Sequence, residues 1–118
     1  MEPFSFRLPA DPAALGPLRR SVREWLEGLE IVEQEVAAIV SACSEIAAGG
    51  VEVGPVEVNG ALAGADVVVR CTGSPEWRIE SHPSRYVAAL LVDDVSIDRS
   101  DESTAVVLRK AASRGLSS

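Results

Sequence analysis

A single amphipathic segment, residues 31–50, constrains most strongly what this chain can fold into. Gly49 and Gly50 end this segment, and because glycine adopts the left-handed conformation of a helix C-cap without steric cost, we expect the helix to stop there. Glu45 lies near that end, which indicates a helix that lines a site or once lined one. Apolar residues recur along the segment at steps of three and four, the pattern of one buried helical stripe: Val32, Val36, Ile39, Val40, Cys43 and Ile46.

Length and charge describe an acidic chain of one domain, residues 1–118. Its 118 residues are 47% hydrophobic, which is enough for a real core. The formal charge of −7 argues against a nucleic-acid partner, because neutralising phosphates requires clustered Lys and Arg. The sequence has no run of about 18 apolar residues and no basic stretch leading into an apolar one, so we expect neither a membrane span nor a secretory signal. We therefore expect a cytoplasmic protein.

Only two cysteines are present, Cys43 and Cys71. They are too few and too far apart in sequence for a zinc cluster, so we expect no metal site of that kind. Without a secretory context, both are interpreted as reduced thiols.

The remaining chain alternates between helical and strand periodicity. Asp11-Pro12 is a strong helix start and Gly28 a stop, which predicts a helix over 12–29. A loop is expected over 72–83. After it a short helix is expected over 84–92, with Val87, Leu90 and Leu91 facing inward. The tail, 111–118, is expected to be frayed. Period-2 patterns predict strands over 4–8, 55–62, 65–71, 94–99 and 104–110, the middle two and the last two forming hairpins.

This order of elements predicts the fold class. Two long helices, a short one and a sheet built largely from hairpins indicate a two-layer α/β sandwich. The sheet is expected to be mixed but mostly antiparallel, with all helices on one face.

Nearly the whole chain resembles the anti-sigma-factor serine kinases of actinobacteria, members of the GHKL ATPase superfamily with the Bergerat, histidine-kinase-like fold. The resemblance rests on the order and length of these stretches: FRLPADPAALGPLRRSVREWLEGL, a helix ending in SEIAAGG, the hairpin PVEVNG–ALAGADVVVRCTGSP, and the ending YVAALLVDDVSIDRSDESTAVVLRK. It implies a Bergerat fold, ATP and Mg²⁺ as cofactors, and protein partners in transcription regulation.

The first motif of that family, E-x-x-x-N on the central helix, is incomplete here. In the family its Glu activates the attacking group and its Asn binds Mg²⁺, both on one helix face. Glu45 matches the Glu, but Gly49 stands at the Asn position. Glycine has no side-chain oxygen to offer a hard cation, so the Mg²⁺ ligand is missing.

The motifs that would hold the nucleotide also depart from the family's pattern. In D-x-G-x-G, Cys71 replaces the adenine-reading Asp, Gly73 is kept, and Pro75 replaces the second glycine. A thiol is a weak acceptor and does not substitute for a carboxylate in reading an amino group. The phosphate-cradling G-x-G corresponds to 82–84, HPS, where a proline removes one backbone donor. Thr104 matches a threonine that touches phosphate in the family.

Two functions from different classes follow. The first is a non-catalytic regulatory module that resembles an anti-sigma factor and has lost ATP and Mg²⁺ binding, a pseudokinase, with Glu45 as a vestigial base. The alternative is a divergent, active ATP-dependent serine kinase of an anti-anti-sigma (STAS-domain) partner, with Glu45 as base. The missing Asn and Asp favour the first. A sigma factor or a STAS-domain protein is the expected partner, and a homodimer is open.

Other residues carry two interpretations each. Cys43 and Cys71 are either small buried hydrophobes or, less in keeping with the sequence, a redox pair. His82, the only histidine, is interpreted as a loop residue. Trp77, outside the periodic segments, is expected to be an exposed aromatic that either plugs the vacated pocket or anchors an interface. A helix face with three arginines is either solvated or a docking stripe: Arg19, Arg20 and Arg23.

Overall fold

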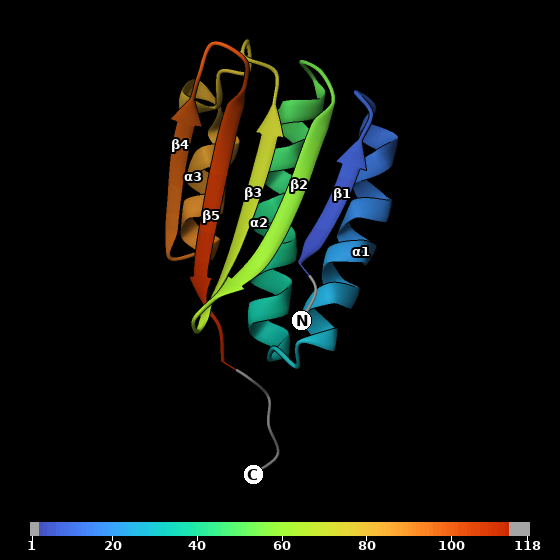
Figure 1. The fold of residues 1–118 in the computed structure, drawn as a ribbon, viewed down its shortest axis with the longest axis vertical. Coiled ribbons are helices and arrows are strands. Elements are labelled where there is room, and N and C mark those ends of the chain that lie inside the picture. Colours follow the sequence, from blue (N-terminus) through green and yellow to red (C-terminus); the bar gives the residue numbers. More distant parts are fainter. Residues whose placement is uncertain (1–2, 114–118) are drawn as a thin grey trace.

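Five strands form one sheet in the computed structural model, which describes residues 3–113 (Figure 1). Their order across the sheet is β1-β2-β3-β5-β4, and every neighbouring pair is antiparallel. The expected mixed sheet is therefore antiparallel throughout, because two helices between β1 and β2 return the chain in the opposite direction. The strands are β1 (Phe4–Leu8), β2 (Val56–Ala63), β3 (Asp66–Gly73), β4 (Asp94–Arg99) and β5 (Thr104–Ala111).

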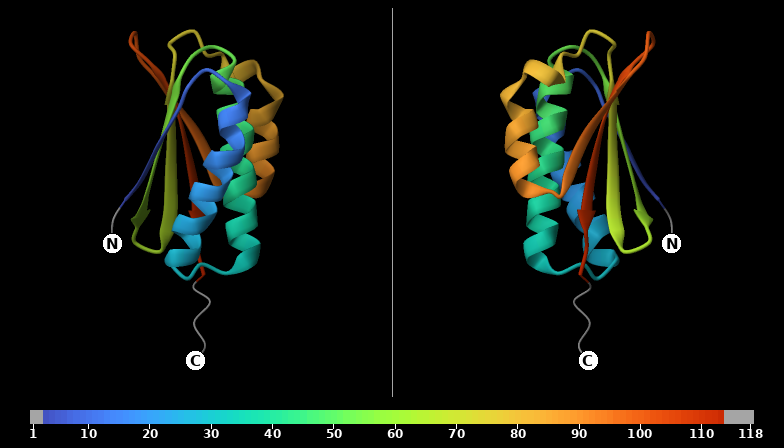
Figure 2. Two further views of the ribbon diagram at one scale, coloured as in Figure 1. Left: turned by 90° about the vertical axis from the view of Figure 1, so that its right-hand side faces the viewer. Right: turned by 90° about the vertical axis from the view of Figure 1, so that its left-hand side faces the viewer.

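The helices cover a single face of this sheet, which confirms the predicted two-layer sandwich (Figure 2). They are α1 (Leu15–Gly28), α2 (Glu33–Val51) and α3 (Pro83–Leu91). A short 3-10 turn, Pro12–Ala14, precedes α1, and the Asp11 side chain caps it by accepting a hydrogen bond from Ala13 N at 2.9 Å. Helix α2 lies between α1 and α3, so its buried stripe forms the centre of the core.

The sequence predicted that the central helix would stop at Gly49 and Gly50, but α2 continues past them. It runs through both glycines to Val51, and the amide groups of Val53 and Gly54 then bond to the Gly50 carbonyl. Neither glycine has positive φ, so neither provides the left-handed cap for which glycine was expected. Their role is set by close packing, as described for the candidate site.

Helix α3 buries a different face from the predicted one. Val87 is 40% and Leu90 is 87% exposed, whereas Ser84 and Ala88 are buried against the rest of the fold. Small side chains allow α3 to approach α2 closely, and this turns the larger apolar residues outward. Of the three side chains predicted to face inward, Leu91 alone is half-buried.

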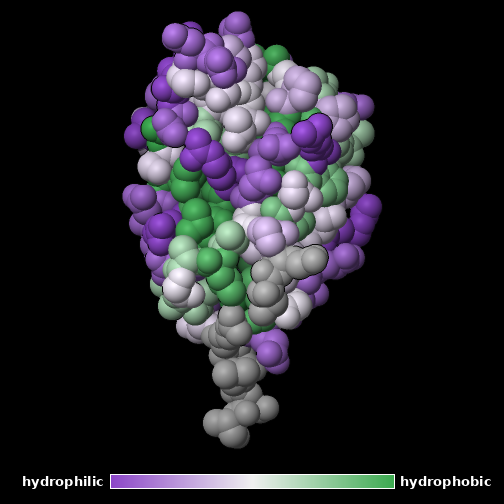
Figure 3. Space-filling model, viewed as in Figure 1, coloured by the Kyte–Doolittle hydropathy of each residue, from purple (hydrophilic) through white to green (hydrophobic). Residues whose placement is uncertain are grey.

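The sheet face away from the helices is open (Figure 3). Ion pairs cross it between Arg7 and Glu57 at 3.0 Å, and between Arg70 and Asp98 at 3.0 Å. Hydrophobic surface gathers in patches between the hydrophilic side chains in this view. The open face is thus largely polar, as an antiparallel sheet with one solvated side should be.

The start of the predicted frayed tail is ordered. Ala111 ends β5, the Ala112 amide bonds to the Ala65 carbonyl, and the Ser113 carbonyl accepts from Val32 N at 3.0 Å. The rest of the predicted tail, 114–118, lies outside the described residues.

Candidate functional site

The candidate site is built around Trp77, in the segment between β3 and α3. Its side chain is buried, with 2% of its surface exposed, so the expectation of an exposed ring is wrong. A β-carbon added to Gly49 would lie 3.5 Å from Trp77 Nε1. The same atom on Gly50 or Gly73 would lie 3.1 Å or 3.0 Å from carbons of the ring. The indole therefore fills the space between the C-terminal turn of α2 and the end of β3.

Glycine at these positions makes room for the ring. At Gly50 an added β-carbon would also lie 2.7 Å from Val56 Cγ2, closer than real side chains approach. Two of the three glycines, Gly49 and Gly73, stand where the resemblance places the Mg²⁺ ligand and the first glycine of the adenine motif. The ring thus occupies the side of the fold to which the resemblance assigns the nucleotide.

Packing alone positions the indole ring. Among residues 3–113, Trp77 Nε1 has no hydrogen-bond partner although it is buried. The backbone of the segment is better fixed, since Trp77 N donates to the Ser74 carbonyl at 3.1 Å. A buried donor without an acceptor costs free energy, which here is offset by the apolar area that a tryptophan buries.

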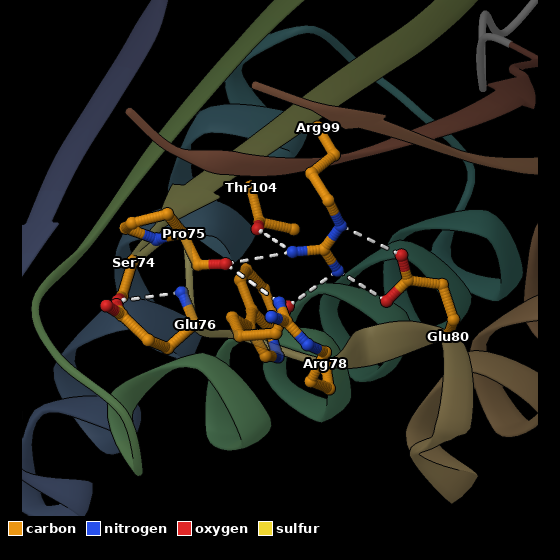
Figure 4. Close-up of polar contacts among 8 residues, drawn as sticks. Ser74, Pro75, Glu76, Arg78, Glu80, Arg99 and Thr104 are labelled. Atoms are coloured by element: carbon orange, nitrogen blue, oxygen red, sulfur yellow. Dashed lines mark hydrogen bonds and ion pairs between the residues drawn. The ribbon is translucent and has the colours of Figure 1, made fainter. Parts of the chain in front are cut away.

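Arg99, at the end of β4, ties this segment to the sheet (Figure 4). Its guanidinium donates to the carbonyl oxygens of Pro75 at 2.9 Å and Trp77 at 2.8 Å. It also pairs with Glu80, with 3.0 Å between Nε and Oε2, and this hydrogen bond lowers the pKa of the Glu80 carboxyl. One side chain therefore holds both sides of Trp77 in place. We call these contacts of Arg99 with Pro75, Trp77, Glu80 and Thr104 the Arg99 latch.

Thr104 belongs to the latch. It is fully buried and its hydroxyl oxygen accepts a hydrogen bond from Arg99 at 2.8 Å. In the sequence it matched a phosphate-contacting threonine. In this fold the hydroxyl is instead bonded to the Arg99 guanidinium.

Glu45 lies away from these contacts. It is exposed on α2, and within residues 3–113 its carboxylate makes no hydrogen bond or ion pair. One helical turn further, Gly49 faces the ring of Trp77 and the hydroxyl of Ser84. The two positions of the family's helix motif thus lie one turn apart on α2, with Glu45 exposed and Gly49 buried.

His82 caps α3 rather than standing free in a loop. Its Nδ1 atom accepts a hydrogen bond from Ser84 N at 3.2 Å and lies 2.6 Å from Ser84 Oγ. Its Nε2 atom lies 3.7 Å from Glu52 Oε2, at the end of α2. The stretch that matches the phosphate cradle is therefore used to start a helix.

Cys43 and Cys71 lie next to each other across the interface of α2 and β3. Both are fully buried free thiols. The neighbouring Cys43 side chain and burial raise the pKa of the Cys71 thiol well above its usual range. A protonated thiol held in the core is a poor nucleophile and a poor acceptor for an amino group.

The three arginines of α1 line one concave surface. It has a volume of about 440 Å³ and is bordered on the other side by Val40 and Ser41 of α2. Arg23 bonds Glu33 at 2.8 Å and Arg19 bonds Ser44 at 3.0 Å. Arg20 makes no ion pair within the described residues, so it is the member of this group most available to a partner.

Two further classes of site were searched for in residues 3–113. No group of three or more His, Cys, Asp or Glu side chains is arranged to hold a metal ion. No helix in the described part of the chain is long and apolar enough to cross a membrane.

A comparison with solved structures adds to this geometry. The chain is similar to the crystal structure of the RsbU and RsbW domains of Rv1364c from Mycobacterium tuberculosis, with a TM-score of 0.83 and 26% sequence identity. The chain has an RsbW-like fold. The match covers 97% of this chain and 33% of the other, so the chain spans about a third of that protein's length. The similarity agrees with the resemblance to GHKL anti-sigma-factor kinases. No protein-family model and no curated protein sequence matches the chain.

Sequence reasoning missed the Arg99 latch, and it expected an exposed Trp77 while leaving open whether the ring plugs the pocket or anchors an interface; its burial agrees with the plug. Arg99 stood in a predicted strand with no partner in sight, and its role depends on a loop that only the tertiary fold brings next to it. A signal for Trp77 was available. Glycines that lie in two separate elements, Gly49 and Gly50 in one and Gly73 in the other, leave a space that one large ring can fill.

Proposed function

We propose that this chain is a non-catalytic regulatory module that acts by protein–protein contact, in the manner of an anti-sigma factor, and that it no longer binds ATP or Mg²⁺. The observation that carries the proposal is the position of Trp77. Its buried ring lies against Gly49 and Gly73, the positions at which the related kinases would hold metal and nucleotide. A nucleotide base and an indole cannot share that space.

The chemistry of the remaining positions supports the same conclusion. Cys71 is buried against Cys43 and offers no carboxylate for an adenine amino group. Gly49 offers no oxygen to Mg²⁺, which prefers octahedral coordination by oxygen ligands. Thr104, the remaining candidate for a phosphate contact, already accepts from Arg99. ATP and Mg²⁺ therefore do not fit the residues that are present.

The alternative, an active serine kinase of a STAS-domain partner, has less support. A general base must lie within hydrogen-bond reach of the proton that it removes. Glu45 is exposed and makes no hydrogen bond or ion pair within residues 3–113, so no group of the fold orients it as a base. We therefore place Glu45 as a surface carboxylate.

The concave surface of α1 is the proposed contact for the partner, a sigma factor or a STAS-domain protein. Arg19 and Arg23 are held by Ser44 and Glu33, so the guanidinium groups are positioned before binding, and Arg20 is free to pair with a partner carboxylate. Arginine is favoured in such contacts because its planar fork binds carboxylates in a fixed geometry.

Titration calorimetry with ATP and ADP, each with Mg²⁺, tests the loss of nucleotide binding. We expect no heat and, in a parallel thermal-unfolding scan, no shift at millimolar nucleotide. A nucleotide at a hundredfold excess over its dissociation constant would stabilise the native state by about 2.7 kcal/mol, which such a scan would detect. Micromolar binding would contradict the proposal, and phosphotransfer to a STAS-domain substrate that Glu45→Ala abolishes would establish the kinase instead.

A further inference from the structure

The outer face of α3 is the most apolar exposed surface on a helix of this fold. Leu90 is 87% exposed, Tyr86 is 64% exposed and Val87 is 40% exposed. Residues three and four apart are neighbours on a helix surface, so Leu90 lies beside both of the others. We call these three residues the α3 ridge. Large exposed apolar groups that adjoin one another mark interaction sites more often than singly scattered ones do.

Packing inside the domain does not explain the ridge. Helix α3 is fixed to the fold through its other side, where Ser84 and Ala88 are buried. The exposed positions of α1 are instead filled by charged residues such as Arg20 and Glu24, as expected for a helix face that meets only water. The ridge therefore has the composition of a contact surface.

Carboxylates border the ridge. A groove of about 340 Å³ runs beside Tyr86 and is lined by Asp93 and Asp94, with Arg85 as its one cation. Asp94 is exposed and makes no ion pair with residues 3–113, while Asp93 is held by Ala111 N at 2.6 Å. Glu52, which follows α2, is also exposed and lies 3.7 Å from His82 Nε2 at the start of α3. The border is acidic, in line with the formal charge of −7 for the chain.

We propose that the α3 ridge and its acidic border dock an amphipathic, basic helix of a partner protein. The apolar stripe of that helix would cover Leu90 and Tyr86, and a flanking Lys or Arg would enter the groove toward Asp94. Charge complementarity favours this occupant over a second copy of the chain, because symmetric pairing would bring the same carboxylates together. The inference rests on the proposed function as a protein-binding module and adds a second surface, separate from the arginines of α1.

A synthetic peptide of leucines at helical spacing and lysines elsewhere serves as the probe. We expect it to bind the full chain in a fluorescence-anisotropy titration, more weakly as salt is raised. A control peptide with the leucines replaced by serines should bind at least about tenfold more weakly, because burying a leucine contributes enough for that ratio. Leu90→Ser and Asp94→Lys should each weaken binding of the leucine peptide by about tenfold.

Two matched variants lie off the ridge. Val53→Ser changes another exposed apolar residue, and Asp101→Lys makes the same charge change in the β4–β5 turn. Both should leave binding unchanged. Equal binding of the two peptides, or no effect of Leu90→Ser, would overturn the inference. So would self-association, measured by sedimentation, that Leu90→Ser abolishes.

The outcome is separable from that of the nucleotide titration. Absent nucleotide binding together with peptide binding that ignores Leu90→Ser would reject the ridge alone. Nucleotide binding together with Leu90-dependent peptide binding would reject the loss of the pocket and keep the ridge.

Discussion

At the scale of single residues, the site is a match in size between one tryptophan and three glycines. Gly49 and Gly50 are consecutive in α2, yet the space around them differs. An added β-carbon meets its nearest atoms at 3.5 Å at Gly49, an ordinary contact, and at 2.7 Å at Gly50. Only the second position requires glycine for steric reasons.

This difference predicts opposite effects for two alanine substitutions. Gly49→Ala should be neutral or stabilise the fold by up to about 1 kcal/mol, because alanine is the better helix former. Gly50→Ala should destabilise it by about 1–3 kcal/mol, since the methyl group would overlap Val56 and crowd Trp77. Urea denaturation of both variants measures this, and equal stability of the two would contradict the packing described here.

The buried thiol of Cys71 predicts a loss of stability at alkaline pH. Its pKa is raised in the folded chain, so the unfolded chain loses the proton first. This thiol leaves the free energy of unfolding unchanged below its pKa in the unfolded chain, about 8.5. Above that pH it lowers the free energy of unfolding by about 1.4 kcal/mol per pH unit. Denaturation between pH 7 and 10 should show this slope in the wild type and a smaller one in Cys71→Ala. Parallel slopes would place the thiol in a less buried environment.

At the scale of elements, the segment between β3 and α3 is a short, closed connection. The Arg99 latch ties its backbone to β4 and β5 on both sides of Trp77, while His82 starts α3 directly after it. These anchors are hydrogen bonds within the domain, so side chains of the fold itself fix the position of the segment.

Removing the Arg99 latch should loosen this segment. Arg99→Met keeps the length of the side chain and leaves the Trp77 carbonyl and the Thr104 hydroxyl without this donor, while the Pro75 carbonyl keeps only its hydrogen bond from Arg78. We expect faster hydrogen exchange over residues 74–81 and a free energy of unfolding that is lower by about 2 kcal/mol. Arg109→Met, which breaks the pair with Asp66 on the open sheet face, is the control. Unchanged exchange in the segment would show that the latch does not hold it.

The elements themselves were largely predictable from the sequence. The strands alternate clearly, and α1 ends at Gly28 as predicted, whereas Asp11-Pro12 starts a 3-10 turn and α1 itself begins three residues later, at Leu15. Two assignments failed for a shared physical reason. Gly50 was interpreted by its backbone freedom and α3 by its apolar content, but the close approach of neighbouring elements decided both. Almost every residue from Tyr86 to Leu91 is apolar, so periodicity could not select the buried face.

The candidate site could be predicted in part from the sequence. The absence of an Asn at Gly49 and of an Asp at Cys71 could be read directly, because each motif position either has the required oxygen or lacks it. The sequence offered two roles for Trp77, a plug of the pocket or an interface anchor, and could not decide between them, since Trp77 comes from a loop without periodicity. Its burial depends on contacts with glycines 27 and 28 residues earlier in the chain and with Gly73.

At the scale of the whole molecule, the fold has an RsbW-like framework, and the side of it that Trp77 fills is part of the core. Trp77 belongs to the same buried cluster as Ile46 and Val56. The proposed contact surfaces both lie on the helices: the arginines of α1 and the α3 ridge. We therefore expect the protein to be regulated by partners that bind these helical surfaces.

Cavity complementation tests most directly whether Trp77 fills that space. Trp77→Ala should lower the free energy of unfolding by about 3–5 kcal/mol, because it leaves a ring-sized cavity between α2 and β3. Added indole should then raise the melting temperature of the variant and leave the wild type unchanged, as a ligand that binds only the native cavity must. Trp25→Ala, on the other side of the core, should not respond to indole. A Trp77→Ala variant that is nearly as stable as the wild type and insensitive to indole would contradict a ring that has taken the place of the nucleotide.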